Sequence, residues 1–347
     1  MAKLPRPLHV FGDFDQESYV TAIDFHKSNN GDIFAICGYQ NAIISTWSLS
    51  TYRCLHRIRL DDHINDKNIK LLRLRSLIYI HARQTLVIEL ASGNACLFHF
   101  DLNDSEKFHL INHCRTLELT YAKMICLLDN RFITYIDPDD SKQLNLMDLD
   151  RPNVTIKTIT KEKSDHGIVM ANHSFIDSDR FLYNFIAYED GFLTIDKSHL
   201  DVNETIIDSE SMLSIQLQKG EILYMDYNDF IKRGIACCAP NEIVLWKCSL
   251  NDINLIKRFT INSESITCCS IRPDGKIFAI GSKDGRIRIF STKMARLLAV
   301  ITYHHECIET LRFTSNLLND DNFKKFLLFA SVQDGSISIW SIYNDSD

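Results

Sequence analysis

Few residues in this chain of 347 have the types and spacing that binding chemistry requires. The segment Gly281–Gly285 reads GSKDG, but a phosphate-binding loop needs the spacing GxxxxGKS/T ahead of a helix, and neither is present. His304 and His305 are adjacent, yet consecutive residues rarely bind one metal ion together and no third ligand is suggested. Because CxxC and HExxH are also absent, the sequence predicts no metal, nucleotide or cofactor site.

Arrangements typical of catalysis are missing as well. Paired carboxylates that cleave glycosidic bonds lie roughly 5–9 Å apart over a pocket, whereas many Asp residues here fall in turn sequences, where the side chain bonds to the backbone. The chain has no Gly-x-Ser-x-Gly sequence for a nucleophilic serine. We therefore expect that the protein is not an enzyme, and we assign no catalytic residue.

We expect His304 to have a structural role rather than to bind a metal ion. It lies four residues before Ile308, which begins an apolar strand. A histidine there can bond across the sheet to the turn residue Asp334 and, through a hydroxyl group, to the indole N–H of Trp340. We expect His304, Asp334 and Trp340 to form a buried polar network, with Ser331 as a candidate for the hydroxyl.

Two loops carry apolar side chains among charges, which is typical of anchors in protein interfaces. The loops are Asp226–Arg233 and Ser315–Lys325, and their candidate contact residues are Tyr227, Phe230, Leu317, Leu318 and Phe323. Both loops join the first and second strands of a repeat and so emerge on the same rim. The alternative is that Phe230 and Phe323 fold back on their own repeat.

The elements that position these residues repeat along the chain. Lys276–Phe290 reads KIFAIGSKDGRIRIF and Phe326–Trp340 reads FLLFASVQDGSISIW, so each is an apolar run, an Asp-Gly pair and a second alternating run. Alternation with period two predicts strands. Asp-Gly between such runs predicts a two-residue hairpin turn in which both positions need φ > 0.

The aromatic residue that closes this pattern, or its substitute, recurs seven times at intervals of 51, 49, 49, 50, 44 and 50 residues. The seven positions are Trp47, Phe98, Met147, Asp196, Trp246, Phe290 and Trp340. A period of this length with several short strands per unit indicates the blades of a β-propeller. The sequence therefore predicts an all-β, seven-bladed propeller as a single domain over residues 1–347.

The ends of the chain predict how the ring closes. The expected repeats are 19–60, 70–110, 116–158, 166–211, 215–258, 264–301 and 306–343. The last repeat has only three strands, which leaves an edge with unpaired backbone groups. An unassigned strand, Leu8–Phe11, precedes the first repeat, and we expect it to pair with Ile337–Tyr343 and complete that blade.

The composition narrows the expected partners and cellular compartment of the protein. A net charge of −7 and a pI near 6.0 give no general attraction for nucleic acids or anionic membranes, so we expect neither as a partner. No apolar run reaches 18 residues and the first ten residues lack the apolar core of a signal peptide. The eleven cysteines fall mostly in predicted strands, where adjacent residues such as Cys237 and Cys238 face opposite sides and cannot simply bond to each other. This indicates reduced thiols in a cytosolic or nuclear protein.

These residues resemble WD repeats in degenerate form. The closing Trp-Asp of such repeats stands here as Trp47-Ser48, Trp246-Lys247 and Trp340-Ser341, and the opening Gly-His has its nearest version in Tyr303-His304. A narrower resemblance covers Gly281–Tyr343 and the opening motifs VTAI and WSL: these are similar to the family that contains ASTRA-associated protein 1 and G-protein β-subunit-like protein 1.

The resemblance implies a non-enzymatic scaffold without a cofactor. The family works with the TTT co-chaperone complex and RuvB-like ATPases, and it supports the maturation of phosphatidylinositol-3-kinase-like kinases and of their pseudokinase relative in chromatin complexes. It also implies a nuclear and cytoplasmic protein, with the nucleus favoured. Two alternatives stay open: another WD-repeat adaptor, such as a ubiquitin-ligase substrate receptor, and a propeller hydrolase.

Overall fold

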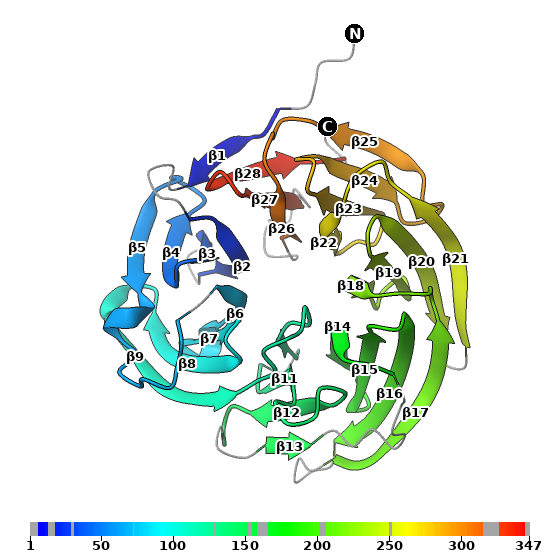
Figure 1. The fold of residues 1–347 in the computed structure, drawn as a ribbon. Coiled ribbons are helices and arrows are strands. Elements are labelled where there is room, and N and C mark those ends of the chain that lie inside the picture. The colour runs from blue at the N-terminus through cyan, green and yellow to red at the C-terminus, as the bar shows by residue number, and fades with distance from the viewer. Residues whose placement is uncertain are drawn as a thin grey trace.

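The computed structural model describes residues 6–12, 18–28, 31–71, 73–127, 130–151, 155–157, 166–200, 206–249, 252–314 and 326–343. In these ranges the chain forms seven antiparallel sheets of four strands each, arranged as blades around a central axis (Figure 1). Apart from two single-turn 3₁₀ helices, the regular structure of the described residues is all β. The predicted seven-bladed propeller is thus confirmed.

Each blade runs from an inner strand at the axis to an outer strand at the circumference (Figure 1). Blade 1 is β2 (Val20–Lys27), β3 (Ile33–Tyr39), β4 (Ile43–Ser48) and β5 (Cys54–Arg59), and blade 2 is β6 (Leu74–Ile80), β7 (Thr85–Leu90), β8 (Asn94–Asp101) and β9 (Asp104–Arg115). Blade 3 is β10 (Ile125–Cys126), β11 (Phe132–Ile136), β12 (Leu144–Asp148) and β13 (Thr155–Lys157), and blade 4 is β14 (Val169–Ile176), β15 (Phe181–Tyr188), β16 (Phe192–Leu200) and β17 (Ile206–Gln216). Blade 5 is β18 (Ile222–Asn228), β19 (Arg233–Cys238), β20 (Glu242–Ser249) and β21 (Asp252–Thr260), and blade 6 is β22 (Ile266–Ile271), β23 (Ile277–Ser282), β24 (Ile287–Ser291) and β25 (Leu297–Ile301). Blade 7 is β26 (Ile308–Phe313), β27 (Leu327–Val332), β28 (Ser336–Ser341) and β1 (His9–Gly12), and the 3₁₀ helices are η1 (Leu60–Asp62) and η2 (His81–Arg83).

The hydrophobic core lies between neighbouring blades. One cluster joins residues of blade 7, such as Phe329 and Ile337, to residues of blade 1, such as Val20 and Tyr39. Both faces of the middle strands are therefore covered, which explains why β7 reads TLVIEL with all six residues buried. The outer strand β21, by contrast, mixes exposed and buried positions because one edge and much of its surface meet water.

The ring closes as predicted, at a seam where β1 from the start of the chain pairs with β28 of blade 7. β1 pairs antiparallel with β28, with His9 opposite Ile339 and Gly12 opposite Ser336. Phe11 is 5% exposed, and its ring centroid lies 4.8 Å from that of Trp47 in blade 1. The first strand therefore completes the last blade and also packs against the blade that follows it in space.

The Asp-Gly turns differ from the two-residue type predicted. Gly335 donates its N–H to the carbonyl of Val332 at 3.0 Å, so the turn spans four residues. Its φ is 85°, whereas Asp334 is not among the residues with positive φ. This is a wider hairpin loop built on a right-handed turn that ends in a left-handed residue. The Asp334 carboxylate accepts the N–H of Ser336 at 2.8 Å, which explains the preference for Asp.

Blade 7 contains a buried polar network around Ser338. The hydroxyl of Ser338 lies 2.7 Å from Nε2 of His304 and accepts the indole N–H of Trp340 at 2.7 Å. Burial, the largest effect, lowers the pKa of His304 and so favours the neutral imidazole. Asp334 makes no direct hydrogen bond to His304 in the described structure, and Ser331 donates to the carbonyl of Val20 instead.

The same serine–tryptophan pairing recurs in blade 1, where Trp47 donates to the hydroxyl of Ser45 at 2.7 Å. In blade 5 the residue two positions before Trp246 is Val244, which has no hydroxyl. The Trp246 indole nitrogen is buried and has no hydrogen-bond partner among the described residues. The indole hydrogen bond thus depends on a serine two residues before the tryptophan, which blades 1 and 7 have and blade 5 does not.

Replacing Phe11 by Ala should weaken the seam. The change empties the contact with Trp47, and truncation of a buried Phe costs about 3–5 kcal/mol in the free energy of unfolding. Leu8→Ala is the matched control, because Leu8 is 58% exposed and its backbone bond to Ile339 is kept. Urea unfolding measures both. Equal stability of the two variants would contradict a stabilising role for the packed strand.

Replacing Ser338 by Ala should leave the Trp340 indole and His304 without their partner. We expect a loss of about 2–3 kcal/mol in the free energy of unfolding, because two buried polar groups lose a hydrogen bond. Ser336→Ala on the same strand should be nearly neutral, since its buried hydroxyl has no partner among the described residues. Thermal and chemical unfolding of the two variants compare them directly. A Ser338→Ala protein as stable as Ser336→Ala would show that the network contributes nothing.

Candidate functional site

The loop between β18 and β19 places one of the two aromatic candidates at the surface. The side chain of Phe230 is 85% exposed, so it does not fold back on its blade. Tyr227 is only 5% exposed and stacks on Trp246, with ring centroids 5.3 Å apart. The prediction of Tyr227 as a contact residue is therefore wrong: it lies in β18, and strand alternation turns it into the core.

The loop is held from both sides. The Asn228 side chain accepts the N–H of Ile231 at 3.2 Å and donates to the carbonyl of Pro273 in blade 6 at 3.0 Å. Ile231 lies against Gly275, where even an added Cβ would meet its side chain at 2.6 Å. These contacts fix the backbone on either side of Phe230 and leave its ring in water.

The other predicted loop, 315–325, lies outside the described residues. Its candidates Leu317, Leu318 and Phe323 therefore remain predictions.

A channel of about 830 Å³ follows the axis, lined by residues from all seven inner strands or from the segments that lead into them. Acidic side chains from these strands link neighbouring blades. Asp24 accepts the backbone N–H of Tyr79 at 2.8 Å, and Asp226 accepts that of Ile271 at 2.7 Å. Arg312 forms an ion pair with Asp24 at 2.8 Å. These carboxylates satisfy N–H groups of the next blade and so hold the ring together.

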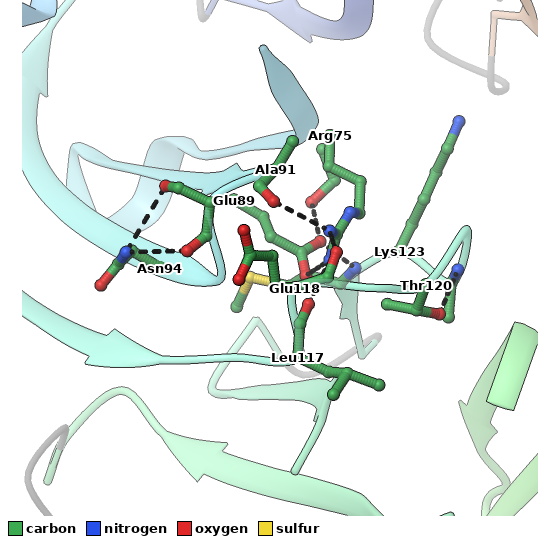
Figure 2. Close-up of polar contacts among 12 residues, drawn as sticks. Arg75, Glu89, Ala91, Asn94, Leu117, Glu118, Thr120 and Lys123 are labelled. Carbon is green, nitrogen blue, oxygen red and sulfur yellow. Dashed lines mark hydrogen bonds and ion pairs between the residues drawn. The ribbon is translucent and has the colours of Figure 1, made fainter. Parts of the chain in front are cut away.

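Blade 3 departs from this pattern because its inner strand has only two residues. The preceding segment, 117–124, is held by a buried ion pair of blade 2, in which Arg75 contacts Glu89 at 3.2 Å (Figure 2). Arg75 also donates to the carbonyl of Leu117 at 2.7 Å, and Glu89 accepts the N–H of Met124 at 3.1 Å. Burial raises the pKa of Glu89, while Arg75 and these hydrogen bonds favour the charged form.

Blade 4 holds the same segment from the other side. Thr120 donates its hydroxyl to the carbonyl of Val169 at 2.6 Å, and the side chain of Asn172 accepts the N–H of Lys123 at 3.1 Å. Side chains thus replace the missing strand ladder. Figure 2 shows the Lys123 side chain extending away from the Arg75–Glu89 cluster, and Lys123 lines the axial channel.

Sequence reasoning missed this constellation. The available signal was a charged residue within an otherwise apolar strand, such as Glu89 in TLVIEL and Asp24 in VTAIDF. Such a charge needs a partner when it is buried, but the sequence does not say which residue supplies it.

The described residues contain no cluster of metal-binding side chains and no helix that could span a membrane. No group of three or more His, Cys, Asp or Glu side chains in the described ranges is placed to hold a metal ion. None of the eleven cysteines forms a disulfide in the described structure. Burial lowers the pKa of His26, in the channel wall, to about 4. The described ranges contain no helix with the length and apolar character needed to cross a bilayer.

Comparisons with known proteins agree with the fold. Residues 236–316 match the model of the anaphase-promoting complex subunit 4 WD40 domain. Over 97% of its length the chain superposes on the β-propeller domain of Cps50 (Swd1) from Myceliophteria thermophila, covering 99% of that chain with a TM-score of 0.67. The sequence identity is 16%, so this likeness shows the fold alone.

Two curated relatives share part of the sequence. Guanine nucleotide-binding protein subunit beta-like protein 1 of Mus musculus is 29% identical over 159 residues, covering 45% of this chain and 43% of the relative. ASTRA-associated protein 1 of Aspergillus flavus is 25% identical over 221 residues, covering 51% of each. The chain spans about half the length of the curated relatives it matches. The resemblance found in the sequence is confirmed: the chain is a β-propeller, part of it matches a WD40 domain model, and about half of it is similar to these two proteins.

Proposed function

We propose that this chain is a non-enzymatic protein-interaction scaffold of an ASTRA/TTT-type assembly, which supports the biogenesis of phosphatidylinositol-3-kinase-like kinases and of chromatin-remodelling complexes. Its partners in this proposal are TTT subunits, RuvB-like ATPases and the large kinases or their pseudokinase relative. It acts in the nucleus and the cytoplasm, with the nucleus favoured.

The observation that carries the proposal is the partial similarity to a relative named ASTRA-associated protein 1, together with the propeller fold. A ring of seven small sheets offers broad surfaces and many loops for partners. The acidic side chains that line the axis are engaged in holding blades together, as Asp24 is by Tyr79 and Arg312, which supports a binding role over a hydrolytic one. The alternative is a WD-repeat adaptor of another complex, such as a ubiquitin-ligase substrate receptor.

Phe230 is the contact residue that we propose for this scaffold. Covering the largely exposed phenyl ring of Phe230 with a partner surface lowers the free energy of the complex. Because Asn228 and Ile231 already fix the loop, little conformational entropy is lost on binding. Exposed aromatic side chains on ordered loops are typical hot spots of protein interfaces.

Affinity purification of the tagged chain, followed by mass spectrometry, tests the assembly. We expect TTT subunits, RuvB-like ATPases and large kinases to be enriched over an untagged control. Recovery of a cullin adaptor without any TTT subunit would favour the alternative and contradict the proposal.

Phe230→Asp should reduce the recovery of the direct partner at least tenfold, because loss of a hot-spot contact costs about 2 kcal/mol or more. Leu255→Asp introduces the same charge on the outer strand β21 of the same blade, where Leu255 is 46% exposed, and should leave recovery unchanged. Equal recovery with both variants would place the contact elsewhere on the ring.

A further inference from the structure

The ammonium group of Lys123 is unpaired inside the axial channel. The backbone N–H of Lys123 is bonded to Asn172, but the side chain makes no ion pair or hydrogen bond with any described residue. Its side chain is solvent-exposed within the channel, yet blades surround it. Desolvation by this enclosure, the largest effect, lowers the pKa of Lys123, and Arg312 of blade 7 acts in the same direction.

The other charges of the channel already have partners. Asp24 is bonded to Arg312 and to the N–H of Tyr79. Asp226 accepts two backbone N–H groups, those of Tyr227 and Ile271, at 2.9 and 2.7 Å. Of the lysine and arginine side chains that line the channel in the described structure, Lys123 is therefore the one without a carboxylate partner.

Two tyrosines line the channel together with Lys123. Tyr121, two residues before Lys123, is 50% exposed, and its ring lies edge-on to that of Tyr224 with centroids 5.8 Å apart. Aromatic side chains and an unpaired ammonium group in one channel suit a ligand that has an anionic group at the end of an apolar stem.

We propose that the axial channel binds an acidic side chain of a partner protein, with the Asp or Glu carboxylate paired to Lys123 and its stem against Tyr121 and Tyr224. One free ammonium balances one carboxylate, whereas a phosphate dianion needs further donors, and Arg312 is engaged by Asp24. The irregular segment 117–124, fixed from blades 2 and 4, positions the amine in advance.

This inference rests on the proposed role as a protein-interaction scaffold, but not on the identity of the assembly. Its test uses the purified full chain and synthetic ligands, so a failed purification of TTT subunits would leave the result unaffected.

The lysines of the chain are dimethylated with a ¹³C label, and their NMR signals are followed during titration. The probes are an N-acetylated, C-amidated pentapeptide with one central Glu between Gly residues, its Gln counterpart and inorganic phosphate. We expect the Glu peptide to shift the Lys123 signal, assigned by its loss in Lys123→Met, and to bind at least tenfold more tightly than the Gln peptide.

Isothermal titration with unlabelled protein supplies the matched variants. Lys123→Met should weaken binding of the Glu peptide at least tenfold and keep the melting temperature, because the ammonium group makes no hydrogen bond or ion pair with the described residues and the backbone bond to Asn172 is kept. Lys293→Met, on the exposed loop before β25, should bind like the unmodified chain. Equal binding of Glu and Gln peptides, unchanged binding by Lys123→Met, or tighter binding of phosphate than of the Glu peptide would each overturn the proposal.

Discussion

The ring depends on one pairing between strands far apart in sequence: His9–Gly12 against Ser336–Ile339. Every blade packs its apolar faces against two neighbours, so the last blade needs a fourth strand as much as any other. Without β1, the outward edge of β28 would present unpaired N–H and C=O groups, and Trp47 of blade 1 would lose the ring of Phe11. The seam turns a row of seven sheets into a closed body.

Polar side chains on the inner strands provide a second constraint. Inner strands approach one another only at the axis, where no sheet ladder links one blade to the next. Asp24 and Asp226 bridge that gap by accepting backbone N–H groups from the following blade. Next to blade 3, the buried Arg75–Glu89 pair of blade 2 takes over this task and holds a segment that is not a strand. Burying such a pair costs desolvation free energy. Here the pair also fixes the position of segment 117–124, which connects blades 2 and 3.

The fold could be predicted from the sequence because the alternation of period two and the spacing of about 50 residues report burial directly. The closing strand followed from the lack of a fourth strand in the last repeat. Details that depend on the direction of a side chain were harder to predict from the sequence. Tyr227 belonged to a strand that extended further than expected, so its ring entered the core.

Similarly, the hydroxyl near His304 belongs to Ser338 rather than Ser331. Ser338 lies two positions before Trp340 and so faces the same side of β28, whereas Ser331 donates to the carbonyl of Val20. Lys123 could not be predicted at all. Its place in the channel depends on contacts from blades 2 and 4 to a segment without regular structure, and no local pattern in the sequence encodes such contacts.

The order of synthesis gives the seam a further consequence. A ribosome makes β1 before any other strand described here and β28 after all the others. During translation, β1 with its apolar residue Phe11 has no strand to pair with until β28 is made. Blades that form before then make an open arc with two exposed ends. The nascent chain therefore has its greatest need of protection from aggregation at both ends of that arc, until the final strand emerges and the waiting one docks beside it.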